Sequence, residues 1–233
     1  MNQLLSIAAT ADLIRTGAAL SLAGPEGALD ALPPGNWIAG TIPYFMASAG
    51  GVVSTEGQVF VTSLPPQGTV TLAHYGADAL KGIVANGPDN GFSVAIVPAG
   101  SAAHKRFAEE AVNDADAFLK PTVGWVAGVH LSDLGSITPK VYDGRTGQKY
   151  ADGVVVAHVA LPESQLASIE IVNIRERLAS YPTEGVSFSC NCILNFLFGE
   201  LEGQSIGALQ GPVTFGEIGY QLLNQTLVVL RIE

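Results

Sequence analysis

The chain has 233 residues and a formal net charge of −10, from 11 Lys and Arg against 21 Asp and Glu. Charged residues make up 14% of it and apolar residues 48%, which excludes a disordered chain and favours a large buried core. An acidic chain without clustered cations is a poor partner for nucleic acid, because phosphates are neutralised by Lys and Arg. The length predicts one domain or two closely packed ones.

The N-terminal stretch favours a cytoplasmic protein. Polar residues interrupt its apolar run, and its first cation is Arg15. Such a segment is too polar for a signal peptide and too short for a membrane span. Cys190 and Cys192 are one residue apart, where a disulfide ring would be strained, so two reduced thiols are expected.

The first half of the chain reads as short helices and strands. Thr10 is the expected cap of a helix that ends at Gly24-Pro25, and a second helix is expected over 25–32 with proline in its first turn. The pattern further predicts strands at 36–41, 52–55 and 58–62 and a helix over 76–84. The strands at 52–55 and 58–62 are expected to form a hairpin through Glu56-Gly57.

The second half begins with a buried strand at 92–97. Ser101 is expected to cap a helix whose apolar face runs from Ala103 to Val112. Further strands are expected at 122–130, 139–142, 153–160, 168–175, 185–190, 212–218 and 225–232, with a short helix over 193–201. The strands at 139–142 and 153–160 are expected to pair around Asp143-Gly144. The fold class predicted is α+β, with mixed, largely antiparallel sheets, flanking helices and a layered arrangement as one option.

Familiar catalytic and nucleotide-binding motifs do not occur. The sequence has no Gly-x-Gly-x-x-Gly, no P-loop and no Gly-x-Ser-x-Gly. Dinucleotide binding, nucleotide hydrolysis and serine hydrolase chemistry are therefore disfavoured. The 4 histidines are far apart and lack metal-ligand spacing, so no metal site is expected. No catalytic residue is assigned, and the cofactor is left unknown.

The side chains best suited to catalysis or ligand binding are Cys190, Cys192 and Glu217. The two cysteines lie at an expected strand-to-helix junction, where unpaired amides would lower a thiol pKa; buried, inert thiols are the alternative. Glu217 lies among apolar residues and glycines, where its carboxylate can face a cavity and accept hydrogen bonds. A strand-end glutamate that faces water is the alternative.

A third segment combines small and aromatic residues. Gly40-Thr41 precedes Tyr44-Phe45 and Gly50-Gly51, so the backbone there can approach a ligand closely. Trp37 and Tyr44 would supply an apolar wall with polar tips. Core packing explains Trp37 equally well.

Several segments, taken in chain order, resemble the FIST family (F-box and intracellular signal transduction). They are PTVGWVAG at 121–128, TPKVYDG at 138–144, DGVVVA at 152–157, SC at 189–190, TFGEI at 214–218 and LNQTL at 223–227. Gly40-Thr41 takes the place of an earlier glycine-rich turn. Residues 1–180 then correspond to the N-terminal region of the family, and 181–233 to a shortened C-terminal region packed on it as one compact unit. The early turn lacks the family's Gly-Glu, and the residues directly after Cys190, at 191–195, do not include the Arg that the family often has there.

This resemblance implies a cytoplasmic sensory domain that binds a small molecule such as an amino acid. We expect the site where the Gly40-Thr41 turn, the Trp125 strand and the Thr214-to-Glu217 strand converge. The expected ligand-binding residues are Trp37, Thr41, Tyr44, Trp125, Cys190, Thr214 and Glu217. A structural or oligomeric interaction module and a Cys-dependent enzyme are the alternatives. Neither nucleic acid nor membrane is an expected partner, and a homo-oligomer is compatible with the high apolar content.

Overall fold

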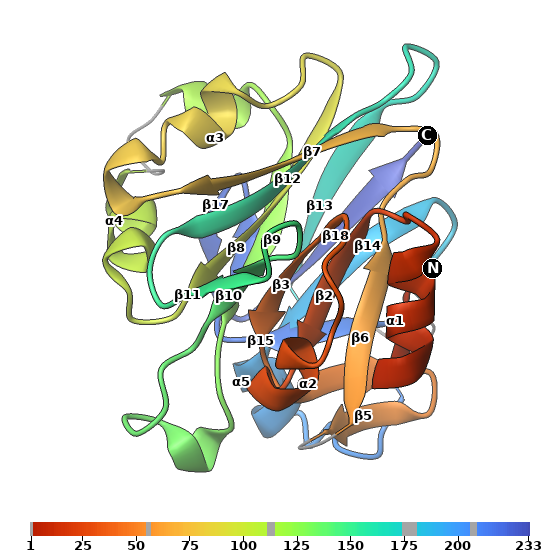
Figure 1. Cartoon of the computed structure of the whole chain (residues 1–233), viewed down its shortest axis with the longest axis vertical. Coiled ribbons are helices and arrows are strands. Elements are labelled where there is room, and N and C mark those ends of the chain that lie inside the picture. The colour runs from red at the N-terminus through yellow and green to blue at the C-terminus, as the bar shows by residue number, and fades with distance from the viewer. Residues whose placement is uncertain (1, 55–56, 111–114, 174–180, 206–208) are drawn as a thin grey trace.

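The computed structural model describes residues 2–54, 57–110, 115–173, 181–205 and 209–233. Within these residues three six-stranded sheets surround one common core, with short helices on the outside (Figure 1). This confirms the predicted α+β class with mixed, largely antiparallel sheets and flanking helices. None of the helices in the described part of the chain has the length and apolar content needed to span a membrane.

The first sheet has the strand order β1-β6-β2-β3-β10-β11. Its strands are β1 (Asn2–Ser6), β2 (Leu20–Gly24), β3 (Trp37–Thr41), β6 (Gln58–Ser63), β10 (Val141–Asp143) and β11 (Gln148–Tyr150). β2 and β3 run parallel because α2 (Glu26–Asp30) connects them. Together with α1 (Ile7–Arg15), this helix covers the apolar outer face of the sheet.

The second sheet has the order β17-β16-β9-β8-β12-β7. Its strands are β7 (Thr69–Tyr75), β8 (Gly91–Pro98), β9 (Thr122–Ala127), β12 (Val154–Ala160), β16 (Glu217–Gly219) and β17 (Gln221–Leu223). β8 and β9 run parallel because α4 (Ala102–Glu110) connects them. This helix and α3 (Gly82–Ala85) cover the outer face. Short 3₁₀ turns, η1 (Ala77–Ala79), η3 (Ala115–Phe118) and η4 (Leu131–Asp133), lie in the connections.

The third sheet, with the order β13-β18-β14-β15-β4-β5, combines distant parts of the sequence. Its strands are β4 (Tyr44–Ala47), β5 (Gly50–Val53), β13 (Ala167–Asn173), β14 (Val186–Cys192), β15 (Gly211–Thr214) and β18 (Thr226–Ile232), and α5 (Ile193–Phe198) follows β14. The region 181–233 therefore adds strands to two sheets, because β16 and β17 belong to the second one.

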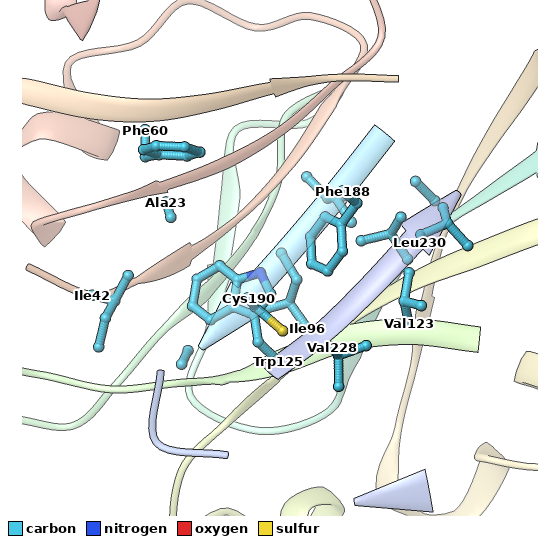
Figure 2. Close-up of a cluster of buried hydrophobic side chains, with 14 of the residues drawn as sticks. Ala23, Ile42, Phe60, Ile96, Val123, Trp125, Phe188, Cys190, Val228 and Leu230 are labelled. Carbon is cyan, nitrogen blue, oxygen red and sulfur yellow. The ribbon is translucent and has the colours of Figure 1, made fainter. Parts of the chain in front are cut away.

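The inner faces of the three sheets meet in one core, part of which Figure 2 shows. Phe60 of the first sheet, Trp125 of the second and Phe188 of the third are each 1% exposed. Alternation along β9 directs Trp125 into this core and Val126 toward the outer helices. Strands buried on both faces explain why the sequence reads as continuous apolar runs.

Element boundaries near the N-terminus differ from those predicted. Ser6, not Thr10, caps α1, and its side chain accepts a hydrogen bond from the Ala9 amide at 3.2 Å. The segment Leu20–Gly24, predicted as helix, is strand β2, because it is fully buried between β6 and β3. The sequence pattern also gives no prediction for the strands β1, β4, β7, β11 and β17.

Several predicted strand pairings are wrong. β5 pairs with β4, whereas β6 joins β1 and β2. β10 pairs with β3 and β11, whereas β12 lies between β7 and β8. The strand predicted over 212–218 is two strands in different sheets, because the chain crosses between the sheets at Phe215 and Gly216. The hairpins that do form, β4–β5 and β10–β11, use other turns than the predicted ones, and β6 and β12 pair with strands farther away along the chain. The predictions for Glu56, Ala111, Val112 and the end of 168–175 fall outside the described residues.

Candidate functional site: a cleft beside a buried acid

A cleft opens at the carboxyl ends of the parallel strands β8 and β9. A cavity of about 420 Å³ is lined by the turn after β8 and by the loop after β9. An adjoining cavity of about 190 Å³ is lined by the same loop and by the segment between β3 and β4. Gly128, Val129 and Ile137 line both cavities, which together we call the carboxyl-end cleft. The loop, residues 128–140, projects from the lower left of the molecule in Figure 1.

The crossover between β8 and β9 explains the position of this cleft. After β8 the chain turns at Gly100 and enters α4 on the outer face of the second sheet. After β9 it leaves in another direction, toward β10 of the first sheet. Where the connections of two parallel strands diverge, a crevice remains outside their carboxyl ends, and such crevices are common ligand sites.

Thr41 anchors both ends of the projecting loop. The Gly128 amide donates a hydrogen bond to the Thr41 carbonyl at 2.7 Å, and the Lys140 amide donates one to Thr41 Oγ1 at 3.0 Å. Tyr44 supports the same loop, because its hydroxyl accepts a hydrogen bond from the Leu131 amide at 3.0 Å. The Tyr44 ring also stacks on His130, with the centroids 5.6 Å apart. The loop therefore has a defined shape next to the smaller cavity.

The two cavities differ in chemistry. Glu26, His130 and Asp133 give the smaller one polar walls. The larger one is lined by uncharged residues, which include Leu134 and Phe215 beside the hydroxyl groups of Ser101 and Thr138. Of the residues described, no Lys or Arg lines either cavity. Because Lys149 Nζ pairs with Glu26 at 2.7 Å, the carboxylate of Asp133 is the acidic group that the described lining offers to a ligand, beside an apolar surface.

A separate cluster of polar side chains surrounds Glu217, which is 0% exposed. Glu217 Oε2 accepts hydrogen bonds from the Thr226 amide at 3.2 Å and from Thr226 Oγ1 at 2.8 Å. Its Oε1 lies 3.5 Å from Thr214 Oγ1. The Cys192 thiol hydrogen-bonds to the same carboxyl group and lies 3.1 Å from Asn224 Oδ1. The acid thus joins β16 of the second sheet to the ends of three strands of the third.

Burial controls the acidity of this cluster. It raises the pKa of Glu217 to about 7, although hydrogen bonds from Thr226, Cys192 and Thr214 act in the opposite direction. Burial also raises the pKa of Cys192, and it raises the pKa of Cys190 well above its ordinary value. Both thiols are free, and the nearby Glu217 adds to each shift.

Both cysteines are therefore expected to react slowly in the folded protein. We expect iodoacetamide to alkylate each thiol at least about tenfold more slowly than free cysteine near neutral pH, because the thiolate is disfavoured and buried. Peptide mass spectrometry after timed alkylation measures both rates, and denatured protein is the control. Fast alkylation of one thiol in the native protein would instead support the Cys-dependent enzyme.

The structure distributes the seven predicted site residues over separate places. Thr41 lines the cleft and Tyr44 supports its loop, whereas Thr214 and Glu217 belong to the buried cluster. Trp125 and Cys190 lie in the core between these places (Figure 2). The Trp125 ring rests against Gly40, where an added Cβ would lie within 3.0 Å of it. Trp37 packs on the outer face of the first sheet beside Tyr142, and its Nε1 donates to the Pro33 carbonyl at 3.0 Å.

The backbone segments nevertheless converge as expected. The Gly128 amide binds the Thr41 carbonyl, and the Phe215 amide donates to the Val126 carbonyl at 3.2 Å. The ring of Phe215 lies directly on Gly128, where a Cβ atom would overlap it. The lining residues Glu26, His130, Asp133 and Phe215 were missed. The available signal was the strand–helix–strand order at 92–130, which places a crevice at the carboxyl ends of the two strands.

Comparisons with known proteins identify a family but give no activity. A family model described as a family of unknown function (DUF6976) matches residues 5–181 and 175–233. A comparison with curated proteins gave no match. The resemblance to the FIST family stays a prediction.

Proposed function

We propose that this chain, which belongs to the family of unknown function DUF6976, binds a small organic molecule in the carboxyl-end cleft. The observation that carries the proposal is the cleft itself. Its larger cavity, of about 420 Å³, is within the usual range for small-molecule sites. It also lies outside the carboxyl ends of two parallel strands, a common place for ligands in such sheets.

The lining favours ligands that carry a positive charge and an apolar part. Asp133 can face an ammonium group, whereas Glu26 is already paired with Lys149 Nζ at 2.7 Å. Leu134, Ile137 and Phe215 can contact a hydrocarbon or ring. Anions such as phosphates would meet negative charge without a Lys or Arg from the described lining. An amino acid ligand, as the FIST resemblance implies, would place its amino group toward the smaller cavity.

A thermal-shift screen tests this proposal. The panel contains amino acids and amines beside carboxylates and phosphates of similar size. A ligand at a hundred times its Kd should stabilise the fold by ~2.7 kcal/mol, which for a chain of this size raises Tm by roughly 5–10 °C. We expect the largest shifts among the amines and amino acids. Unchanged melting across the whole panel would contradict small-molecule binding.

Filling the cleft should abolish the response. Thr138 is exposed and lines the larger cavity, so Thr138→Trp occupies the space without disturbing the core. We expect this variant to keep the Tm of the parent chain and to lose the ligand-induced shift. Thr69→Trp is the matched control, because Thr69 is an exposed threonine of β7 that lines neither cavity. A ligand shift that survives in Thr138→Trp would place binding elsewhere.

The proposed role is that of a cytoplasmic sensory domain without catalysis. Its proposed partner is the ligand, and neither nucleic acid nor membrane is included, since a net charge of −10 opposes binding to anionic surfaces. A homo-oligomer stays a prediction that light scattering with and without ligand would test.

A further inference from the structure

Glu217 occupies a junction that small-molecule binding in the cleft does not explain. The chain leaves the third sheet at the end of β15 and enters the second sheet at β16, with Phe215 and Gly216 as the crossover. Glu217 is the first residue after this crossover. Thr214, the last residue before it, places its hydroxyl 3.0 Å from the Gly216 carbonyl. The acid and its neighbours therefore fix the point where two sheets are joined.

The turn between β17 and β18 covers this carboxyl group. Thr226, directly after the turn, supplies both hydrogen bonds to Glu217 Oε2. Asn224 and Gln225 within the turn are exposed, and Gln225 has a φ of 57°. The Cys192 thiol, 3.1 Å from Asn224 Oδ1, connects this turn to the cluster. The turn is thus the natural place for the cluster to open.

The surroundings of Glu217 offer hydrogen bonds but no compensating cation. The side chains that face it come from β9, β14, β15 and β18 and from its partner strand β17: Trp125, Cys190, Cys192, Thr214, Leu223 and Thr226. The titratable groups among them are the two thiols. None of the ion pairs formed by described residues includes Glu217. A carboxylate here is a buried charge held by neutral donors only.

Protonation removes that charge without loss of the Thr226 hydrogen bonds. A proton on Oε1 would face the Thr214 hydroxyl at 3.5 Å, and Oε2 would keep both of its donors. We propose that Glu217 is a proton-dependent lock between the second and third sheets: the neutral acid keeps the β17–β18 turn closed, and ionisation favours its opening. The lock does not depend on a ligand in the cleft, although the crossover that it holds also carries Phe215 into the cleft wall.

The direction of the pH effect follows from the raised pKa. The closed state holds its proton up to a pKa of about 7, whereas an exposed glutamate has the ordinary value of 4.5. Between these values the open state has lost its proton and the closed state has kept it. The equilibrium constant for opening therefore rises by about tenfold per pH unit between pH 4.5 and 7, because one proton is released, and it levels off above pH 7.

Hydrogen exchange of the Thr226 amide tests the lock, because that amide donates directly to Glu217. After correction for intrinsic exchange, we expect its protection factor to fall by about tenfold per pH unit between pH 5 and 7 and then to level off. The amide of Ala157, in the middle of β12, is an internal control. Its protection factor should change with pH only as far as the global stability of the protein changes. In the Glu217→Gln variant, the protection factor of the Thr226 amide should no longer fall as the pH rises.

A second variant keeps the test decisive if Glu217→Gln fails to fold. Thr226→Val removes the hydroxyl that lowers the pKa of Glu217 and preserves the shape of the side chain. We expect it to move the levelling point to higher pH. The proposal is overturned if the protection factor of the residue-226 amide in Thr226→Val depends on pH as it does in the parent chain. It is also overturned if that protection factor still falls with pH in Glu217→Gln, or if carbon-13 NMR shows the Glu217 carboxyl titrating near 4.5.

Discussion

Replacing Gly124 by alanine is expected to lower the free energy of unfolding by at least about 3 kcal/mol. Gly124 lies in β9, between β8 and β16, and has a φ of 152°. A Cβ atom at this position would lie well within 3.0 Å of the Ala95 backbone on β8. Backbone in the middle of a sheet cannot give way as a flexible side chain can, so strain and overlap act together. Urea unfolding followed by circular dichroism measures the loss.

Gly27→Ala is the matched control for this prediction. Gly27 lies in α2, and a Cβ atom built there has no neighbour within 4 Å. Alanine has the higher helix propensity, so we expect this variant to be as stable as the parent chain or more stable by up to about 1 kcal/mol. A Gly124→Ala variant that unfolds at the same urea concentration as Gly27→Ala would show that β9 can shift away from β8.

Local patterns predicted much of the fold, whereas strand partners required information from the whole chain. The strands at 36–41 and 92–97 and the helix capped by Ser101 appear where expected, because burial and capping act over a few residues. The segment Leu20–Gly24 failed, since its small and apolar residues suit a helix as well as a doubly buried strand. β5 and β6 failed differently: each is a strand, but β5 pairs with β4, which the pattern did not predict, and β6 pairs with the distant strands β1 and β2.

The candidate site shows the same contrast between what local sequence patterns predict and what requires the whole fold. The sequence singles out Glu217 because an acid between glycines and apolar residues is unusual, and the structure gives it 0% exposure and three hydrogen-bonding residues. Its partner Thr226 lies in a segment that resembles the FIST family, but no spacing rule joins it to Glu217. Asp133 and Glu26 could not be assigned from sequence, since an acid in a loop or in the first turn of a short helix is ordinarily a solvated one. Asp133 reaches the cleft in the loop after β9, and Glu26 reaches it at the start of α2, between the parallel strands β2 and β3.

Glu217→Gln is expected to stabilise the protein at pH 8 by about 3 kcal/mol, the free-energy equivalent of a pKa raised from 4.5 to about 7. The neutral acid is favoured in the folded state, so its contribution is full below pH 4.5 and lost as the pH rises through 7. Glutamine imitates the neutral acid at every pH, because its amide oxygen can accept both Thr226 hydrogen bonds. The variant and the parent chain should therefore have similar stability at pH 4.5 and diverge toward pH 8.

A second buried group, His158, also makes the stability of the protein depend on pH, so the effect of Glu217 must be measured by comparing a variant with the parent chain. His158 has a lowered pKa because burial disfavours its charged form, so it contributes stability at neutral pH that is lost as the pH falls below 6.5. Its hydrogen bonds to Tyr75 and Ser93, both 2.8 Å, belong to the neutral ring. The two groups thus give opposite slopes between pH 5 and 7, and the parent profile alone can be flat. The contribution of His158 cancels in the difference between the unfolding free energies of Glu217→Gln and the parent chain, measured by urea at each pH, so this difference reports on Glu217 alone.

Glu163→Gln, at an exposed glutamate, is the control and should show no pH-dependent difference from the parent chain. If Glu217→Gln differs from the parent by a constant free energy from pH 4.5 to 8, the folded protein holds Glu217 as an ordinary carboxylate.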